Sequence, residues 1–144
     1  MKNILASVAV LVVVIGGLIW LKSISPTEEE IISEKGAILA EQGLHWHPEL
    51  KIFVKGEEIT IPENVGLGTV HNPIHTHEDL PIIHLEFNGV VYESDTELGK
   101  FFEVWNKDFM EFGPSVAMMV NGEPNTELQN YKMKDGDKII LNYE

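Results

Sequence analysis

The sequence predicts an α+β domain that is held at a membrane by its N-terminus. Three features carry this prediction: short β-type runs recur from residue 50 onward, one amphipathic helical segment at about 95–110 interrupts them, and an uncharged apolar stretch begins the chain. At 144 residues the chain is long enough for one domain with attachments. We expect a transmembrane anchor at residues 1–22, a helical stalk at 23–43 and the α+β domain at 44–144.

The predicted anchor is the segment ILASVAVLVVVIGGLIWL, residues 4–21, which contains no charged side chain. As a helix it would span roughly 27 Å, close to the thickness of a hydrocarbon core. A cleavable signal peptide is the alternative, but its apolar part is usually only about 7–15 residues long, and the nearest small-residue site, at Ser23 and Ser25, precedes Pro26. Lys2 favours a cytoplasmic N-terminus. We therefore predict a single-pass protein of the cell membrane with an extracytoplasmic domain.

The next segments predict a helical stalk followed by two β-hairpins. Ser25, Pro26 and Glu28 fit a capping box with proline at the first helical position, and Gly43 can end this helix. The run LKIFV, a Lys-Gly-Glu turn and the run EITIP form the first predicted hairpin, at residues 50–62. The second is IIHLEF and VVYES joined by Asn88-Gly89, the preferred pair for a type I′ turn.

The second half of the chain predicts one core helix and two further strands. Ser94 and Glu97 fit another capping box. Apolar side chains then recur on one helical face, at Leu98, Phe101, Phe102, Trp105 and Phe109. Strands follow at SVAMMV, which ends at Asn121-Gly122, and at KIILNY, which is entered through Asp135-Gly136. One stripe of large aromatic residues facing several short strands predicts a helix packed across a sheet.

The C-terminal segments VAMMVNGE and YKMKDGDKIILNYE resemble the corresponding part of the β-grasp (ubiquitin-like) fold. The resemblance covers about residues 94–144 and implies a mixed sheet crossed by the helix. Four strands are expected before the helix, where the plain β-grasp has two, so the N-terminal half would be an elaboration. A sulfur-carrier activity is not implied, because the chain ends in NYE rather than in Gly-Gly.

Composition excludes several kinds of site. The chain has no cysteine, which excludes disulfides, thiolate metal sites and cysteine nucleophiles. It has no arginine and a formal net charge of -13, which argues against nucleic acid as a partner. An acidic surface instead attracts cations, metal ions among them.

All six histidines lie within residues 45–84, and this clustering predicts a metal site. Two H-x-H pairs place two imidazoles on one side of an extended segment, and a third strand adds one histidine on its non-core face. A nitrogen-ligated site needs three or four such groups from separate strands. The predicted ligands are His45, His47, His75, His77 and His84. His71 belongs to no pair and is left out, and Glu78 and Glu86 are expected to orient the ligands.

The order of these motifs resembles a family of small, membrane-anchored, largely uncharacterised prokaryotic proteins. The family pattern combines H-x-H-P, an IP-x-N-x-G segment, H-T-H followed by an acid, I-H-x-E and L-G-x-F-F with a tryptophan. In this chain these motifs occupy residues 45–48, 61–66, 75–78, 83–86 and 98–102, with Trp105. The resemblance implies that the histidines act as one unit, and it assigns no reaction. H-T-H-E also suggests a cupin, but the next suitable acid, Glu86, lies nine positions after His77, farther than that motif places it, so a cupin stays a minor alternative.

Imidazole ligands without thiolates suit copper or zinc, both of which are commonly handled outside the cytoplasm. The favoured function is a membrane-tethered protein that captures or delivers metal, for which the partners would be the membrane, the ion and a second membrane or extracytoplasmic protein. One alternative is a histidine-ligated metalloenzyme in which Glu78 or Glu86 is the base for a bound water. Another is an assembly module whose metal stabilises the loop 66–81. The absence of H-E-x-x-H and G-x-S-x-G favours a binding protein over an enzyme.

Overall fold

The computed structural model describes residues 26–144. The chain divides into two units between Glu34 and Lys35, and the second unit, Lys35–Glu144, holds all the strands described below. The predicted anchor lies outside the described residues. Within residues 26–144, no helix has the length and apolar character that crossing a bilayer requires.

Helix α2, Glu28–Lys35, is shorter than the predicted stalk. Its capping box uses Thr27 and Glu30: the Glu30 N–H donates to Thr27 Oγ1 at 3.2 Å, and the Thr27 N–H donates to Glu30 Oε2 at 2.8 Å. Gly36 follows with φ of +80°, a left-handed conformation in which the helix cannot continue. The predicted helix end at Gly43 is therefore wrong, and residues 38–40 form strand β1, Ile38–Ala40.

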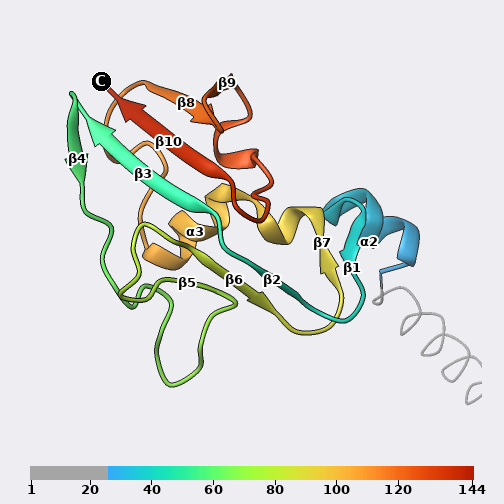
Figure 1. Ribbon diagram of the computed structural model, residues 1–144. Helices are drawn as coiled ribbons and strands as arrows, with labels where there is room; N and C mark the ends of the chain where they lie inside the picture. The colour runs from blue at the N-terminus through green and yellow to red at the C-terminus, as the bar shows by residue number, and fades with distance from the viewer. Residues whose placement is uncertain (1–25) are drawn as a thin grey trace, which may run out of the picture. The chain divides into compact units, whose positions relative to one another are not determined.

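A five-stranded mixed sheet forms one layer of the domain (Figure 1). The strand order is β4-β3-β10-β8-β9, with the last strand of the chain in the centre. Strand β10 runs parallel to β3 and antiparallel to β8. The predicted α+β class is confirmed. The five strands are β3 (Glu49–Val54), β4 (Glu57–Ile59), β8 (Val116–Val120), β9 (Glu123–Asn125) and β10 (Lys138–Tyr143).

Two tight turns set the hairpins of this sheet. Lys55 and Gly56 have φ of 51° and 86° between β3 and β4, and Asn121 and Gly122 have φ of 55° and 87° between β8 and β9. Consecutive positive φ values define the turn that matches the twist of paired strands. The hairpin predicted at residues 50–62 is confirmed, and so is the turn predicted at Asn121-Gly122.

Helix α3, Leu98–Trp105, is shorter than the predicted 95–110. A 3₁₀ turn, η1 (Glu93–Thr96), precedes it, and Asn106 ends it in the left-handed conformation with φ of 58°. The predicted capping box of Ser94 and Glu97 is wrong, because Glu97 is the N-cap and its side chain makes no capping hydrogen bond. A second 3₁₀ turn, η2 (Leu128–Asn130), lies before β10.

The helical stripe packs into one core with the sheet. Leu98, Phe101, Phe102 and Phe109 are buried, and Trp105 is partly buried against them. Figure 1 places α3 behind the sheet, and the same apolar cluster contains Leu50, Ile52, Ile139, Leu141 and Tyr143 from β3 and β10. Phe109 reaches this core from the turn beyond the helix, where its ring lies 6.2 Å from the Tyr143 ring between centroids.

A second, three-stranded sheet carries the histidines. Its order is β2-β6-β5, formed by β2 (Leu44–Trp46), β6 (His84–Phe87) and β5 (Ile74–His75). The predicted hairpin around Asn88-Gly89 is wrong: β7, Val91–Tyr92, pairs with β1 rather than with β6. Strand β6 already has β2 on one edge and β5 on the other, so no edge remains for β7.

Candidate metal centre

One face of the three-stranded sheet gathers the predicted ligands. His45 on β2 lies opposite Glu86 on β6, and His75 on β5 lies opposite His84 on β6. Residues that are paired across strands project to the same face, as do residues two apart along a strand. His84 and Glu86 thus sit in the middle of this face, with one histidine strand on each side. The opposite face carries Leu44, Ile74 and Leu85, all of which are buried in the core.

The H-T-H segment is held in place by Thr76, a residue that the sequence analysis did not single out. Thr76 is fully buried. Its hydroxyl donates to the Pro62 carbonyl at 2.9 Å and accepts from the Val65 N–H at 3.0 Å. Its backbone N–H donates to the Val65 carbonyl at 3.1 Å. These bonds fix the backbone between His75 and His77 against the loop that precedes it.

Gly66 allows this loop to approach β5 closely. It has φ of +76°, and a Cβ at this position would lie 2.5 Å from the Ile74 carbonyl oxygen and 2.9 Å from a Val104 methyl carbon. Glycine is therefore required here by both backbone conformation and space.

His75 and His77 already have the spacing of two ligands of one ion. The two Nε2 atoms lie 3.2 Å apart. Nitrogens that are each about 2.0–2.1 Å from a metal ion lie roughly 2.9–3.4 Å from each other. His75 Nδ1 lies 3.0 Å from the Asn72 carbonyl oxygen, so Nδ1 carries the proton and Nε2 the lone pair. Burial lowers the pKa of His75, which favours the neutral form of this ring.

His84 is buried and has one nitrogen free to bind an ion. Its Nε2 lies 3.1 Å from both carboxylate oxygens of Asp79, and the hydrogen bond from His84 lowers the pKa of Asp79. Its Nδ1 is buried and has no hydrogen-bond partner among the described residues. A carboxylate that accepts from one ring nitrogen leaves the lone pair on the other, which is how many metal-binding histidines are oriented. An unpartnered buried nitrogen is costly, and a metal ion would satisfy it.

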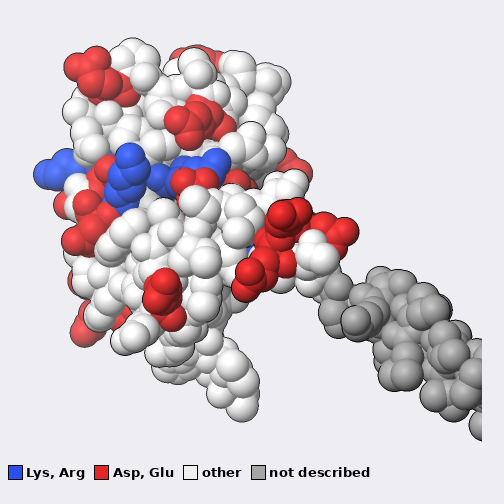
Figure 2. All heavy atoms as spheres, turned by 90° about the vertical axis from the view of Figure 1, so that its right-hand side faces the viewer, with Lys and Arg blue, Asp and Glu red and all other residues white. Residues whose placement is uncertain are grey.

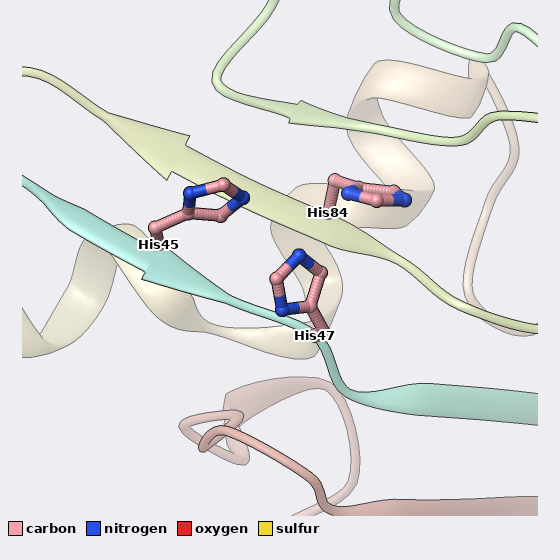
Figure 3. Close-up of side chains that lie close together, drawn as sticks. All are labelled: His45, His47 and His84. Carbon is pink, nitrogen blue, oxygen red and sulfur yellow. The ribbon is translucent and has the colours of Figure 1, made fainter.

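His45 and His47 approach His84 from strand β2 and the residues just after it (Figure 3). The His45 and His47 ring centroids lie 4.7 Å apart, and those of His47 and His84 lie 5.0 Å apart. The backbone N–H of His47 donates to Asp135 Oδ1 at 2.8 Å. Asp135 belongs to the turn before β10, so the last turn of the large sheet positions a histidine of the small one. From the sequence, Asp135 is predicted only as part of that turn.

Glu86 contacts histidines of both flanking strands. Its Oε1 lies 3.0 Å from His45 Nε2 and 3.9 Å from His84 Nδ1, and its Oε2 lies 4.0 Å from His75 Nε2. Its side chain is 44% exposed. This central carboxylate can orient the rings, or bind an ion beside them.

The structure places the five predicted ligands in two overlapping triads. His45, His47 and His84 form one, and His75, His77 and His84 form the other; within each, the three ligand atoms lie within 4.8 Å of one another. His71 is exposed and belongs to neither triad, and its ring centroid lies 6.5 Å from that of His75. Glu78 is exposed and makes no hydrogen bond or ion pair with a described residue; its neighbour Asp79 is the acid that contacts His84.

The histidine face borders a hollow of about 600 Å³. His45, His75 and Glu86 line it, together with His71 and Asn72. The cluster is therefore accessible from solvent at one side. Figure 2 shows another aspect of the surface, on which acidic side chains are widely scattered and the lysines gather in a band. With a net charge of -13, the protein's field favours the approach of cations.

Comparisons with known protein families, with curated proteins and with solved structures find no match to this chain.

Proposed function

We propose that this protein is a membrane-tethered, extracytoplasmic metal-binding protein that captures or delivers copper or zinc. The observation that carries the proposal is the convergence of two histidine pairs on His84, whose buried Nδ1 lacks a partner among the described residues. Five imidazoles from three strands and two flanking segments are more than packing or solubility requires. They are the ligand type that both ions accept.

The ligand set supports borderline transition metals over calcium or magnesium. Calcium and magnesium are bound mainly by oxygen ligands, whereas these triads offer nitrogens. Copper(II) has the higher intrinsic affinity for nitrogen ligands. Zinc has no geometric preference from its d-electrons, so it can also bind the triads as they are arranged. Copper is our first choice on the ground of this higher affinity for nitrogen ligands.

Strand order supports assigning the large sheet to the β-grasp fold. A hairpin, a helix, a second hairpin and a final strand follow one another, and that final strand lies parallel to the first strand, in the centre of the sheet. The small sheet of β2, β5 and β6 would then be the elaboration that carries the site. The proposed kinship with the small anchored prokaryotic proteins is supported by the site, because three of its motifs supply all five histidines.

A metalloenzyme is the second candidate, and Glu86 is the observation that favours it. This carboxylate lies within 4.0 Å of a nitrogen of three histidines and borders the hollow. It could accept a proton from an ion-bound water. Glu78 is less suited to this role, because it is exposed and makes no hydrogen bond or ion pair with a histidine among the described residues.

Metal titration of the full chain in detergent tests the proposal. We expect one equivalent of Cu(II) or Zn(II) to bind at pH 7.5, and a variant with all five histidines changed to alanine to bind none. Affinity should fall as the pH drops through about 6.5, because imidazole binds metal only when neutral. His71→Ala is the matched control, since it removes an imidazole beside the site but outside both triads. An unaltered affinity in the five-histidine variant would end the proposal.

The anchor has its own test. We expect the mature protein to begin at Met1 and to stay with the membrane through a high-salt wash, because a roughly 27 Å apolar helix is released by detergent and not by salt. Mass spectrometry of the intact protein and fractionation of membranes measure both. A mature N-terminus near Pro26 would show that the segment is a cleaved signal.

A further inference from the structure

We infer that the two triads are successive stations for one metal ion, which enters at His45 and His47 and passes to His75 and His77 while it stays bound to His84. This inference rests on the proposed function and adds a direction to it. We call His45, His47 and His84 the outer triad, and His75, His77 and His84 the inner triad.

Exposure separates the two stations. The side chains of His45 and His47 are 62% and 41% exposed, whereas that of His75 is 3% exposed. A hydrated ion arriving from solvent therefore meets the outer pair first. His47 and His77 are both half-buried, so the stations differ in exposure at His45 and His75. An ion beside the buried His75 is less hydrated than one beside His45, and its interaction with ligands is stronger there.

The shared residue limits the cluster to one ion at a time. Asp79 contacts His84 Nε2 with both carboxylate oxygens, which leaves a neutral imidazole with a single lone pair, on Nδ1. One lone pair binds one ion. The outer and inner pairs must then compete for an ion held by His84, rather than each holding its own.

The inner triad is the better prepared of the two. His75 is oriented by the Asn72 carbonyl, its backbone is fixed through Thr76, and its Nε2 already lies 3.2 Å from that of His77. His45 Nε2 instead lies 3.0 Å from Glu86 Oε1 at an exposed position, and an incoming ion must replace this contact. Preorganised ligands lose less freedom on binding, so the ion should rest at the inner triad.

Glu86 lies between the stations. Its two oxygens face His45 on one side and His75 on the other, at 3.0 Å and 4.0 Å. A carboxylate in this position can hold the ion while the outer imidazoles leave and the inner ones bind. No bond other than metal–ligand bonds is made or broken in this transfer, and the charge of the ion does not change.

The experiment compares two double variants of the full chain in detergent, with Cu(II) as the probe. Equilibrium titration gives stoichiometry and Kd, and stopped-flow quenching of protein fluorescence gives the rates. A station that the ion only passes through affects both rates equally and leaves Kd unchanged. We therefore expect His45→Ala/His47→Ala to bind one equivalent with a near wild-type Kd. Its association and dissociation rates should both fall about tenfold, a change within the range that association rates cover among variants of one binding surface.

We expect the opposite pattern for His75→Ala/His77→Ala. Association should stay near the wild-type rate, and affinity should fall at least about 100-fold. Losing a residue that only hydrogen-bonds to a metal ligand typically costs about 10–100-fold, and this variant loses two ligands themselves. His77→Ala serves as the second variant should the buried His75 position not tolerate alanine; it is expected to weaken Kd without slowing association. Glu86→Gln should slow loading and leave Kd within a few-fold.

Three results would overturn the inference while leaving metal binding intact. Two equivalents in the wild type, with one retained in each double variant, would mean separate sites or an ion pair bridged by His84. Loss of binding in both double variants would mean a single site that needs all five histidines. A weakened Kd with unchanged rates of loading in the His45/His47 variant would make the outer triad the resting site. A wild-type chain that binds no Cu(II) would instead refute the proposed function.

Discussion

His84→Ala is expected to abolish tight metal binding, with a loss of affinity well above 100-fold. His84 is the one residue common to both triads, so its removal leaves two isolated histidine pairs. Substituting a residue that only hydrogen-bonds to a metal ligand typically lowers metal affinity about 10–100-fold, and loss of a shared ligand should lower it further. Titration with Cu(II) and Zn(II), followed by fluorescence and by elemental analysis of the purified protein, measures the effect.

Asp79→Asn keeps the His84 imidazole and tests whether Asp79 must hold it in one tautomer for metal to bind. The amide can donate to His84 Nε2 as well as accept from it, so the ring is no longer held in the tautomer that leaves Nδ1 free. We expect affinity to fall about 10–100-fold. Glu78→Gln is the matched control, because it removes a neighbouring exposed charge that makes no hydrogen bond or ion pair with a described histidine, and its effect should be small. Equal losses in the two variants would mean that Asp79 acts only through its charge.

A structural cause of lost binding must be excluded for His84→Ala. The residue is buried, but its ring lies on the face of β6 opposite the apolar core. The alanine variant should therefore retain the circular dichroism spectrum of the wild type. A folded His84→Ala protein that still binds metal tightly would remove the basis of both triads.

The sequence predicted the members of the histidine cluster because strand periodicity places them on one face. The H-x-H spacing and the apolar alternation of Ile83, Leu85 and Phe87 put the imidazoles opposite the core, and the registers His45–Glu86 and His75–His84 agree with that assignment. The metal-ligand role of each histidine stays a prediction. What spacing could not provide was the grouping into two triads, since this depends on which strands are neighbours. That information lies in long-range pairing and not in local pattern.

The same limit explains the errors. Asn88-Gly89 has the sequence of a hairpin turn, but both edges of β6 are taken by β2 and β5, which come from residues 44–46 and 74–75. Local propensity is weak when tertiary pairing competes with it. Asp79 and Asp135 were missed because a carboxylate in a polar turn carries no distinguishing signal until the structure brings a histidine beside it. Thr76 was missed for a similar reason: a threonine between two histidines reads as a spacer.

Phe102→Ala is expected to destabilise the fold by about 3–5 kcal/mol, the usual cost of truncating a large aromatic residue in a core. Its side chain is 1% exposed. The ring lies against those of Phe109, Phe101 and Trp105, at centroid distances of 4.9, 6.0 and 6.0 Å. Removing it would leave a cavity between α3 and the core that the surrounding rings can only partly fill.

Trp105→Ala tests the same packing at a position with more exposure. Its ring is partly buried, between Phe101 and Phe112, so we expect a loss below that of Phe102→Ala but well above the ~0.5 kcal/mol that limits most surface changes. Glu103→Ala, on the exposed side of the same helix, is the control and removes only a surface ion pair with Lys100. Urea unfolding of the full chain, followed by near-ultraviolet circular dichroism, gives all three values. A loss for Phe102→Ala as small as that for Glu103→Ala would mean that α3 does not contribute to the core, and that the sheet bearing the histidines is supported in some other way.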